Sequence, residues 1–434
     1  MRRLKDALCA MLVCALAGCI HLPPVADMSA GVSLDAASPR AATVPFTLDD
    51  NRVFVEVSFV RPDGGARKVL AFVNPGQGGL TLSNALFREL DPRPGRPLHM
   101  KFGTMDIAVD GAAVLPESLS NNMTIGLDPF GHGPTPAEAA HGRGGEMADF
   151  AAPLPVEAVI PPGLLQHFQV VFDYGARTMT LAAPGTLMPD GIAVPIRVNP
   201  KTGFAMMDAT IDGTAHVFVL DNGGSYGGLR DAAPLIAAHP QWLRAMGGVG
   251  EANLTMQGAE VGVPVVKARN VAFGPLTLDE LGVIQMGGGG PLNALAAHLF
   301  WDDIYSAKAG EDVDGMLGGN VLKSFRLTID YPGRMSYWRQ EAPLDTHDLD
   351  QVGLTLARSR GMTTVAGIAG RNGADTVSGV APGDRLVKID GRDTGPMTRG
   401  ELLAALHGTP GEAKHLTLER DGRPFTVDAP VTGF

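Results

Sequence analysis

Two polar side chains in this sequence each follow an apolar strand and precede a glycine turn. Asp221 comes directly after a strand-like run and is followed by Asn222-Gly223-Gly224, whereas Asn74 follows a similar run and precedes Pro75-Gly76. A glycine turn lets the backbone pass close beside the preceding side chain at the end of a strand. Asp221 can therefore do acid–base chemistry, while the Asn74 amide donates a hydrogen bond but delivers no proton.

The elements that must position these side chains recur along the chain. Residues 163–175 predict a short helix and then an apolar strand that ends in Asp173-Tyr174, and residues 320–332 repeat this plan up to Asp330-Tyr331. The glycine turns and the Asp-Tyr pairs both recur at an offset of roughly 150 residues, which indicates an internal repeat. We predict two homologous β-rich lobes, at residues 45–185 and 186–342.

Both lobes resemble the retropepsin-like and pepsin-like aspartyl proteases. The second lobe carries Leu220-Asp221-Asn222-Gly223-Gly224-Ser225 and later Met316-Leu317-Gly318-Gly319, with Asn222 where the family has Thr or Ser. The first lobe departs further, with Phe72-Val73-Asn74-Pro75-Gly76 and then Val159-Ile160-Pro161. The resemblance implies a mainly β fold of two aspartyl-protease-like β-barrel lobes in one chain.

The same resemblance implies where a reaction would occur. Two carboxyl groups would face each other across the lobes, one ionised as the base and one protonated as the acid, because like charges close together cannot both ionise. Asp221 would be the base, Asn74 a degenerate partner, and Gly223 and Gly76 the turn glycines. Replacement of the second acid by Asn74 implies an impaired enzyme, a pseudoprotease.

The C-terminal residues 350–434 resemble a small α+β PDZ domain of the kind that accompanies bacterial proteases. The sequence APGDRLVKIDG at residues 381–391 carries this resemblance. It implies that a peptide C-terminus adds as a strand, with its carboxylate held by the loop at Val352, Gly353 and Leu354. Residues 399–407 would form the opposite wall. The alternative is that this domain only packs against the lobes, which then occlude its groove.

The N-terminus predicts export and anchoring. Residues 1–18 join basic residues to an apolar run too short to span a membrane, which is typical of a signal peptide. The ending Leu16-Ala17-Gly18-Cys19 resembles a bacterial lipobox, which implies a lipidated Cys19 and, with Ile20 next, an outer-membrane lipoprotein facing the periplasm. Residues 19–44 are rich in Pro, Ala and Ser, so we expect a tether there.

Composition limits the remaining classes. The net charge of −11 argues against a nucleic-acid partner. The chain has three cysteines, all within the first 19 residues, so we expect no disulfide in the folded part. Two histidines occur at residues 128–155, but their spacing fits no metal-ligand pattern, and we expect neither metal nor cofactor. No Gly-x-Ser-x-Gly motif of serine hydrolases occurs.

Three functions remain open from the sequence. The first is a catalytically impaired aspartyl-protease fold that binds peptides in its cleft or through the PDZ domain. The second is an active aspartic endopeptidase that uses Asp221 as its catalytic acid or base, paired either with an unassigned acid or with Asp221 of a second chain. The third is a non-enzymatic scaffold of the cell envelope, whose PDZ domain recruits partners.

Overall fold

The computed structural model describes residues 26–74, 78–117, 156–255, 258, 260–286, 297–359 and 361–434. The protein is 47% strand and 14% helix, so the mainly β class is confirmed. Its described strands form sheets of 14, 12 and 7 strands. None of these sheets closes into a barrel, so the expected β-barrel form of the lobes is wrong. In the described residues, the first and last strands of each sheet do not pair with each other.

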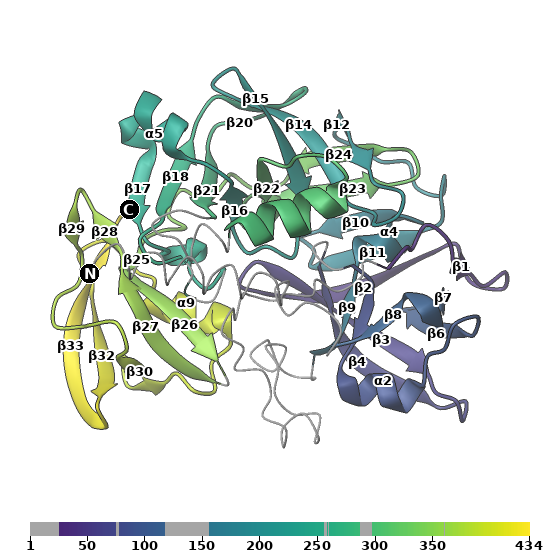
Figure 1. Cartoon of the computed structure of the whole chain (residues 1–434), viewed down its shortest axis with the longest axis horizontal. Helices are drawn as coiled ribbons and strands as arrows, with labels where there is room; N and C mark the ends of the chain where they lie inside the picture. The colour runs from purple at the N-terminus through teal and green to yellow at the C-terminus, as the bar shows by residue number, and fades with distance from the viewer. Residues whose placement is uncertain are drawn as a thin grey trace, which may run out of the picture.

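Three parts of the chain are distinguished below by residue number, and Figure 1 shows them in purple to blue, teal to green, and yellow-green to yellow. The first half contains β1 (Val32–Leu34), β2 (Ala41–Asp49), β3 (Arg52–Val60), β4 (Ala66–Val73), β5 (Leu80–Leu82), α2 (Asn84–Leu90), β6 (Pro97–Phe102), β7 (Met105–Asp110), η1 (Gly111–Ala113), β8 (Val114–Pro116), β9 (Val156–Ile160), α4 (Pro162–Leu165), β10 (Gln169–Asp173) and β11 (Thr178–Ala182). The second half contains β12 (Ile192–Pro195), β13 (Arg197–Val198), β14 (Ala205–Ile211), β15 (Thr214–Leu220), β16 (Gly227–Leu229), α5 (Ala233–Ala238), η4 (Pro240–Trp242), β17 (Leu243–Met246), η5 (Gly250–Ala252), β18 (Pro264–Ala268), β19 (Val271–Phe273), β20 (Leu276–Leu278), β21 (Leu281–Gln285), η6 (Leu299–Ser306), α7 (Ala307–Ala309), β22 (Gly315–Leu317), α8 (Gly319–Leu322), β23 (Phe325–Asp330) and β24 (Met335–Gln340). The C-terminal unit contains β25 (Gln351–Val352), β26 (Leu354–Ser359), β27 (Met362–Ile368), β28 (Gly370–Arg371), β29 (Ala374–Asp375), β30 (Arg385–Ile389), β31 (Arg392–Asp393), α9 (Arg399–Leu406), β32 (Ala413–Arg420) and β33 (Arg423–Thr432).

The two halves repeat one order of strand pairings. In the first half, β4 pairs in parallel with β9, β9 antiparallel with β5, and β5 in parallel with β8. In the second half, β15 pairs in parallel with β22, β22 antiparallel with β16, and β16 in parallel with β21. A short helix and a hairpin then follow in each: α4 with β10–β11, and α8 with β23–β24. The repeat predicted from the sequence therefore extends to the strand pairings.

One sheet joins the halves at their centre. Strand β10 pairs antiparallel with β23, from Gln169 opposite Asp330 to Asp173 opposite Arg326. The two Asp-Tyr strands thus lie side by side and run in opposite directions. The largest hydrophobic core continues across this junction and includes Phe172, Leu327 and Trp338. Because both halves contribute side chains to this core, the packing of one half constrains the position of the other.

The C-terminal unit has its own core and is attached to the second half through a sheet. Its strands run in the order β25-β33-β32-β30-β27-β26, with α9 packed against them. Helix α9 begins at a capping box, in which Thr398 and Glu401 each bond the other's backbone N–H. Met246 at the end of β17 pairs with Gly370 of β28, so the sheet of the second half continues into this unit.

The tether expected at residues 19–44 is wrong for residues 26–44, which belong to the fold. Met28 is fully buried, β1 pairs with β7, and β2 pairs with β11 and β3. In β2 the side chains of Ala42, Val44 and Phe46 alternate inward, a short period-two pattern that the Pro- and Ala-rich composition conceals. Within the described ranges, no helix is long and apolar enough to cross a membrane.

Candidate functional site

The Asp221 carboxyl group lies at the end of β15 and is held from one side by its own turn. Its backbone N–H donates to the carbonyl of Leu317 on β22, 3.0 Å away. Its Oδ1 accepts from the N–H groups of Gly223 and Gly224 at 2.9 and 3.0 Å. The side chain is only 2% exposed. The apolar strand thus delivers one carboxyl group to a buried position, and the glycine turn fixes its orientation.

The second carboxyl oxygen is covered by an aromatic side chain. The Tyr305 hydroxyl donates to Asp221 Oδ2, and Tyr305 belongs to η6, which forms part of the green helix near the centre of Figure 1. Tyr305 is held among Phe204, Phe300 and Trp301. The Trp301 indole N–H donates to the carbonyl of Met286 at 2.8 Å, which ties the helix to the end of β21. Both oxygens of the carboxyl group are therefore engaged by the protein itself.

Asp221 is buried, and burial changes its affinity for a proton. Burial raises the pKa of Asp221 above its ordinary value, and the hydrogen bonds from Tyr305 and from the turn only partly offset this effect. Burial also lowers the pKa of the nearby Lys308 to about 8, with the Asp221 charge acting in the opposite direction. The environment thus disfavours charge on both groups.

Asn74 occupies the equivalent position in the first half and lies against the Asp221 turn. Its backbone N–H donates to the carbonyl of Ile160 on β9 at 3.1 Å, as that of Asp221 does to Leu317. Asn74 is 2% exposed. A Cβ atom added to Gly223 would lie 2.5 Å from Asn74 Oδ1 and 3.0 Å from its Cα. Asn74 therefore touches the Asp221 turn, and Gly223 is required because no side chain fits between Gly223 and Asn74. Gly76 lies outside the described residues, as does Cys19.

A third segment reaches this site from the turn between β2 and β3. Asn51 donates through Nδ2 to the carbonyl of Ser225 at 3.2 Å, and to Glu251 Oε2 at 2.8 Å. Neither Asn51 nor Tyr305 was predicted from the sequence, because each comes from an element remote from the glycine turns. The sequence does contain one signal, the adjacent aromatic residues Phe300 and Trp301, which lie in the same helix as Tyr305.

The predicted carboxylate loop of the C-terminal unit is buried. Val352 ends β25, Leu354 begins β26, and both are fully shielded from solvent. A Cβ atom on Gly353 would collide with the Thr376 hydroxyl oxygen, so the close backbone approach that calls for glycine is made here to the protein. The structure brings these three residues together, and residues 248–254 of the second half lie against the neighbouring strand β26.

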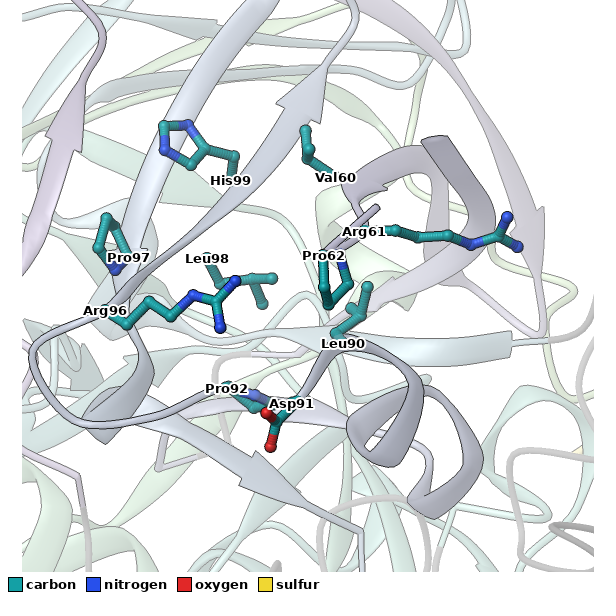
Figure 2. Close-up of a pocket in the computed structure, with 10 residues that line it drawn as sticks. All are labelled: Val60, Arg61, Pro62, Leu90, Asp91, Pro92, Arg96, Pro97, Leu98 and His99. Atoms are coloured by element: carbon teal, nitrogen blue, oxygen red, sulfur yellow. The ribbon is translucent and has the colours of Figure 1, made fainter. Parts of the chain in front are cut away.

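Two other kinds of site were considered. Among the described residues, no group of three His, Cys, Asp or Glu side chains is arranged to hold a metal ion. A cavity of about 280 Å³ lies on the first half. Figure 2 shows that Arg61 points away from the other lining side chains, and Arg61 pairs with Glu89. His99, which also lines it, is paired with Asp106 at 2.8 Å. These charged groups are engaged with neighbours rather than aimed at a common point.

Comparison with known proteins provides no independent assignment. No protein-family model matches the chain, and no curated protein matches it. The candidate site is therefore defined by its geometry alone: the buried Asp221 carboxyl group, Asn74 in contact with the Asp221 turn, and the Tyr305 hydroxyl on Oδ2.

Proposed function

We propose that this protein is a catalytically silent aspartyl-protease-like envelope lipoprotein whose PDZ-like C-terminal unit recognises peptides. In this proposal the lobes span residues 45–185 and 186–342, the PDZ-like unit spans residues 350–434, and lipid on Cys19 anchors the chain to the outer membrane on its periplasmic side. The observation that carries the proposal is the pairing of the Asp221 turn with Asn74, together with the Tyr305 hydroxyl on Asp221 Oδ2.

The chemistry of peptide hydrolysis explains why this pairing matters. An aspartyl protease needs one carboxylate to take a proton from water and one carboxylic acid to give a proton to the scissile carbonyl. Asn74 carries no acidic proton, and loss of positioned proton transfer typically lowers the rate by about 10²–10⁴-fold. The outer oxygen of Asp221, which would hold the attacking water, accepts the Tyr305 hydroxyl instead.

The active-endopeptidase alternative rests on a different observation. Burial raises the pKa of Asp221, which favours the protonated form that a proton donor needs. For substrate to reach it, Tyr305 must leave Oδ2 and the helix η6 must move. The scaffold alternative shares the absence of catalysis with the proposal and differs from it in assigning no function to the region of Asp221 and Asn74.

The decisive experiment restores the missing acid and removes the covering hydroxyl. We expect the native protein to leave a fluorogenic peptide library uncut between about pH 3 and pH 7. The double variant Asn74→Asp/Tyr305→Phe should gain acid-optimum cleavage, because the carboxyl groups at positions 74 and 221 then share one proton. Pepstatin and the added change Asp221→Asn should each abolish that gain.

Two results would contradict the proposal. Cleavage by the native protein that disappears in Asp221→Asn would establish an active endopeptidase. A folded double variant without any activity would reject the aspartyl-protease assignment of the two halves. Tyr305→Phe alone is the matched control: it uncovers Asp221 but supplies no second acid, so it should remain inactive.

A further inference from the structure

Strand β26 of the C-terminal unit offers a sheet edge that another part of the chain already occupies. This strand ends the seven-stranded sheet and pairs with β27 on one side. On the other side, the Asn253 amide donates to the Leu354 carbonyl at 2.7 Å and accepts from the Leu356 N–H at 2.9 Å. A side-chain amide thus makes the two hydrogen bonds that the peptide group of an added strand would make.

The residue after Asn253 fills the apolar space beside that edge. Leu254 is fully buried and belongs to the core of the C-terminal unit, together with Leu354 and Leu356 of β26 and Leu402 and Leu406 of α9. Its φ of 56° is in the left-handed region, which a leucine rarely adopts. Its insertion among the residues of another unit accounts for a backbone conformation that the local sequence does not favour.

Further contacts hold the segment along the groove. The Thr355 hydroxyl donates to the Gly248 carbonyl at 3.0 Å, and the Gly250 N–H donates to Gln351 Oε1 at 3.0 Å. Helix η5 packs against α9, the opposite wall. Residues 248–254, which include the short helix η5, therefore contact the edge strand β26, the helix α9 and the apolar space between them. An extended peptide contacts the same three surfaces in strand addition.

We propose that residues 248–254 are an intramolecular ligand that occupies the peptide groove between β26 and α9. Asn253 replaces the main chain of a peptide and Leu254 its anchoring side chain. The external partner is an extended peptide with a leucine-like anchor, which must displace this segment. The inference rests on the peptide-recognition role proposed above.

Occupation from within the same chain sets a threshold for that partner. A tethered ligand competes at an effective concentration on the order of millimolar. If the segment is bound for about 99% of the time, the apparent affinity for an external peptide falls by about 100-fold. Weak peptides are thereby excluded, whereas a tight or locally concentrated partner gains entry.

The test uses the full chain and a peptide copied from the segment itself. A fluorescein-labelled peptide with the sequence of residues 246–255, MGGVGEANLT, is titrated into the native protein, Leu254→Ala and the control Leu278→Ala. Leu278 is a similarly buried leucine on β20, at the opposite end of the 12-stranded sheet. We expect Leu254→Ala to bind the peptide at least tenfold more tightly than the other two chains, by fluorescence anisotropy.

Hydrogen exchange provides the second readout. The Leu356 amide should exchange faster in Leu254→Ala than in the native protein, and saturating peptide should restore its protection. Equal affinities of the three chains, or no binding by Leu254→Ala, would overturn the inference. If circular dichroism shows that Leu254→Ala does not fold, Asn253→Leu removes both edge hydrogen bonds and must give the same gain. None of these readouts depends on Asp221. A negative result here would therefore reject the intramolecular ligand, whereas peptidase activity of the native protein would reject the proposed function.

Discussion

The Asp221 carboxyl group is buried and accepts hydrogen bonds from three donors. Two backbone N–H groups and the Tyr305 hydroxyl point at its oxygens, yet burial is the larger influence and raises its pKa. A group of this kind orients the glycine turn and ties it to η6 whether or not it ionises. Asp221 therefore has a structural role that does not depend on catalysis and is compatible with Asn74 opposite.

The raised pKa of Asp221 predicts a pH-dependent effect of Asp221→Asn. The pKa of the Asp221 carboxyl group rises on folding from its ordinary value of 3.8, so the folded state binds the proton more tightly than the unfolded state. The resulting stability is fully present below the unfolded pKa. It is lost as the pH rises through the folded pKa. The amide has no such proton. We expect Asp221→Asn to gain stability relative to the native protein as the pH rises from about 4 through the raised folded pKa, as measured by urea unfolding.

The control for this comparison is Asp63→Asn, in an exposed turn where Asp63 Oδ1 accepts from the Gly65 N–H. A relative loss of stability by Asp221→Asn as pH rises would mean that the three donors outweigh burial and keep the native carboxylate ionised.

For single residues of the site, the sequence was informative only for side chains next to the glycine turns. Asp221 and Asn74 were identified because an apolar strand before a glycine turn is a local pattern. Tyr305 and Asn51 approach from elements that are distant in sequence, and no local pattern records such a contact. Leu254 was missed for the same reason, and its positive φ has no signature in a leucine.

Among the elements, the two-residue turn between β2 and β3 joins all three parts of the molecule. Asp50 and Asn51 both have positive φ, as a type I′ hairpin turn requires. From this turn, Asn51 contacts the Asp221 turn through Ser225, and Arg52 donates to the Leu254 carbonyl at 3.4 Å. A turn of the first half thus supports both the candidate site and the segment in the groove.

The same hairpin caps the helix of the C-terminal unit, which predicts the effect of Asp49→Ala. Asp49 Oδ1 accepts from the Thr398 hydroxyl at 2.5 Å and from the Gly400 N–H at 3.0 Å. Removal of a capping oxygen typically costs about 1 kcal/mol of folding free energy. We expect a loss of this size in urea unfolding, whereas Asp63→Ala in the exposed turn should lose less. An equal loss in both variants would show that Asp49 stabilises only its own hairpin.

Most hairpins and helices were predictable from local signals. Strands β3 and β4 flank a Pro-Asp-Gly-Gly turn, β32 and β33 flank Asp421-Gly422, and helices α2 and α9 begin after the capping residues Ser83 and Thr398, all of which are local sequence signals. The expectation was wrong for β1 and β2, where composition suggested a tether. It was also wrong for barrel closure, because which strand edges meet depends on long-range pairing that no local pattern contains.

For the whole molecule, shared sheets predict that the three parts unfold together. The first two halves share the sheet containing β10 and β23, and the second continues into the C-terminal unit at β28. All three tryptophans, Trp242, Trp301 and Trp338, lie in the second half. We therefore expect tryptophan fluorescence and far-ultraviolet circular dichroism to report one coincident unfolding transition.

The variant Leu418→Ala tests this coupling from the far end of the chain. Leu418 is fully buried in the core of the C-terminal unit, where such a change costs about 2–5 kcal/mol. The tryptophan transition of the second half should shift by the same amount as the circular dichroism. Met188→Ala, at a 97% exposed position, should shift neither. A second transition that leaves the tryptophan signal in place would contradict the coupling.

The pairing of β10 with β23 also has a consequence during synthesis. When the first half leaves the ribosome, β10 has β11 on one side, but its other edge must wait for β23. At translation rates of about 5–20 residues per second, that wait is on the order of ten seconds or more. An unpaired apolar edge is a template for association with other chains. A first half that folds before β23 is in place therefore exposes an apolar edge that is prone to association.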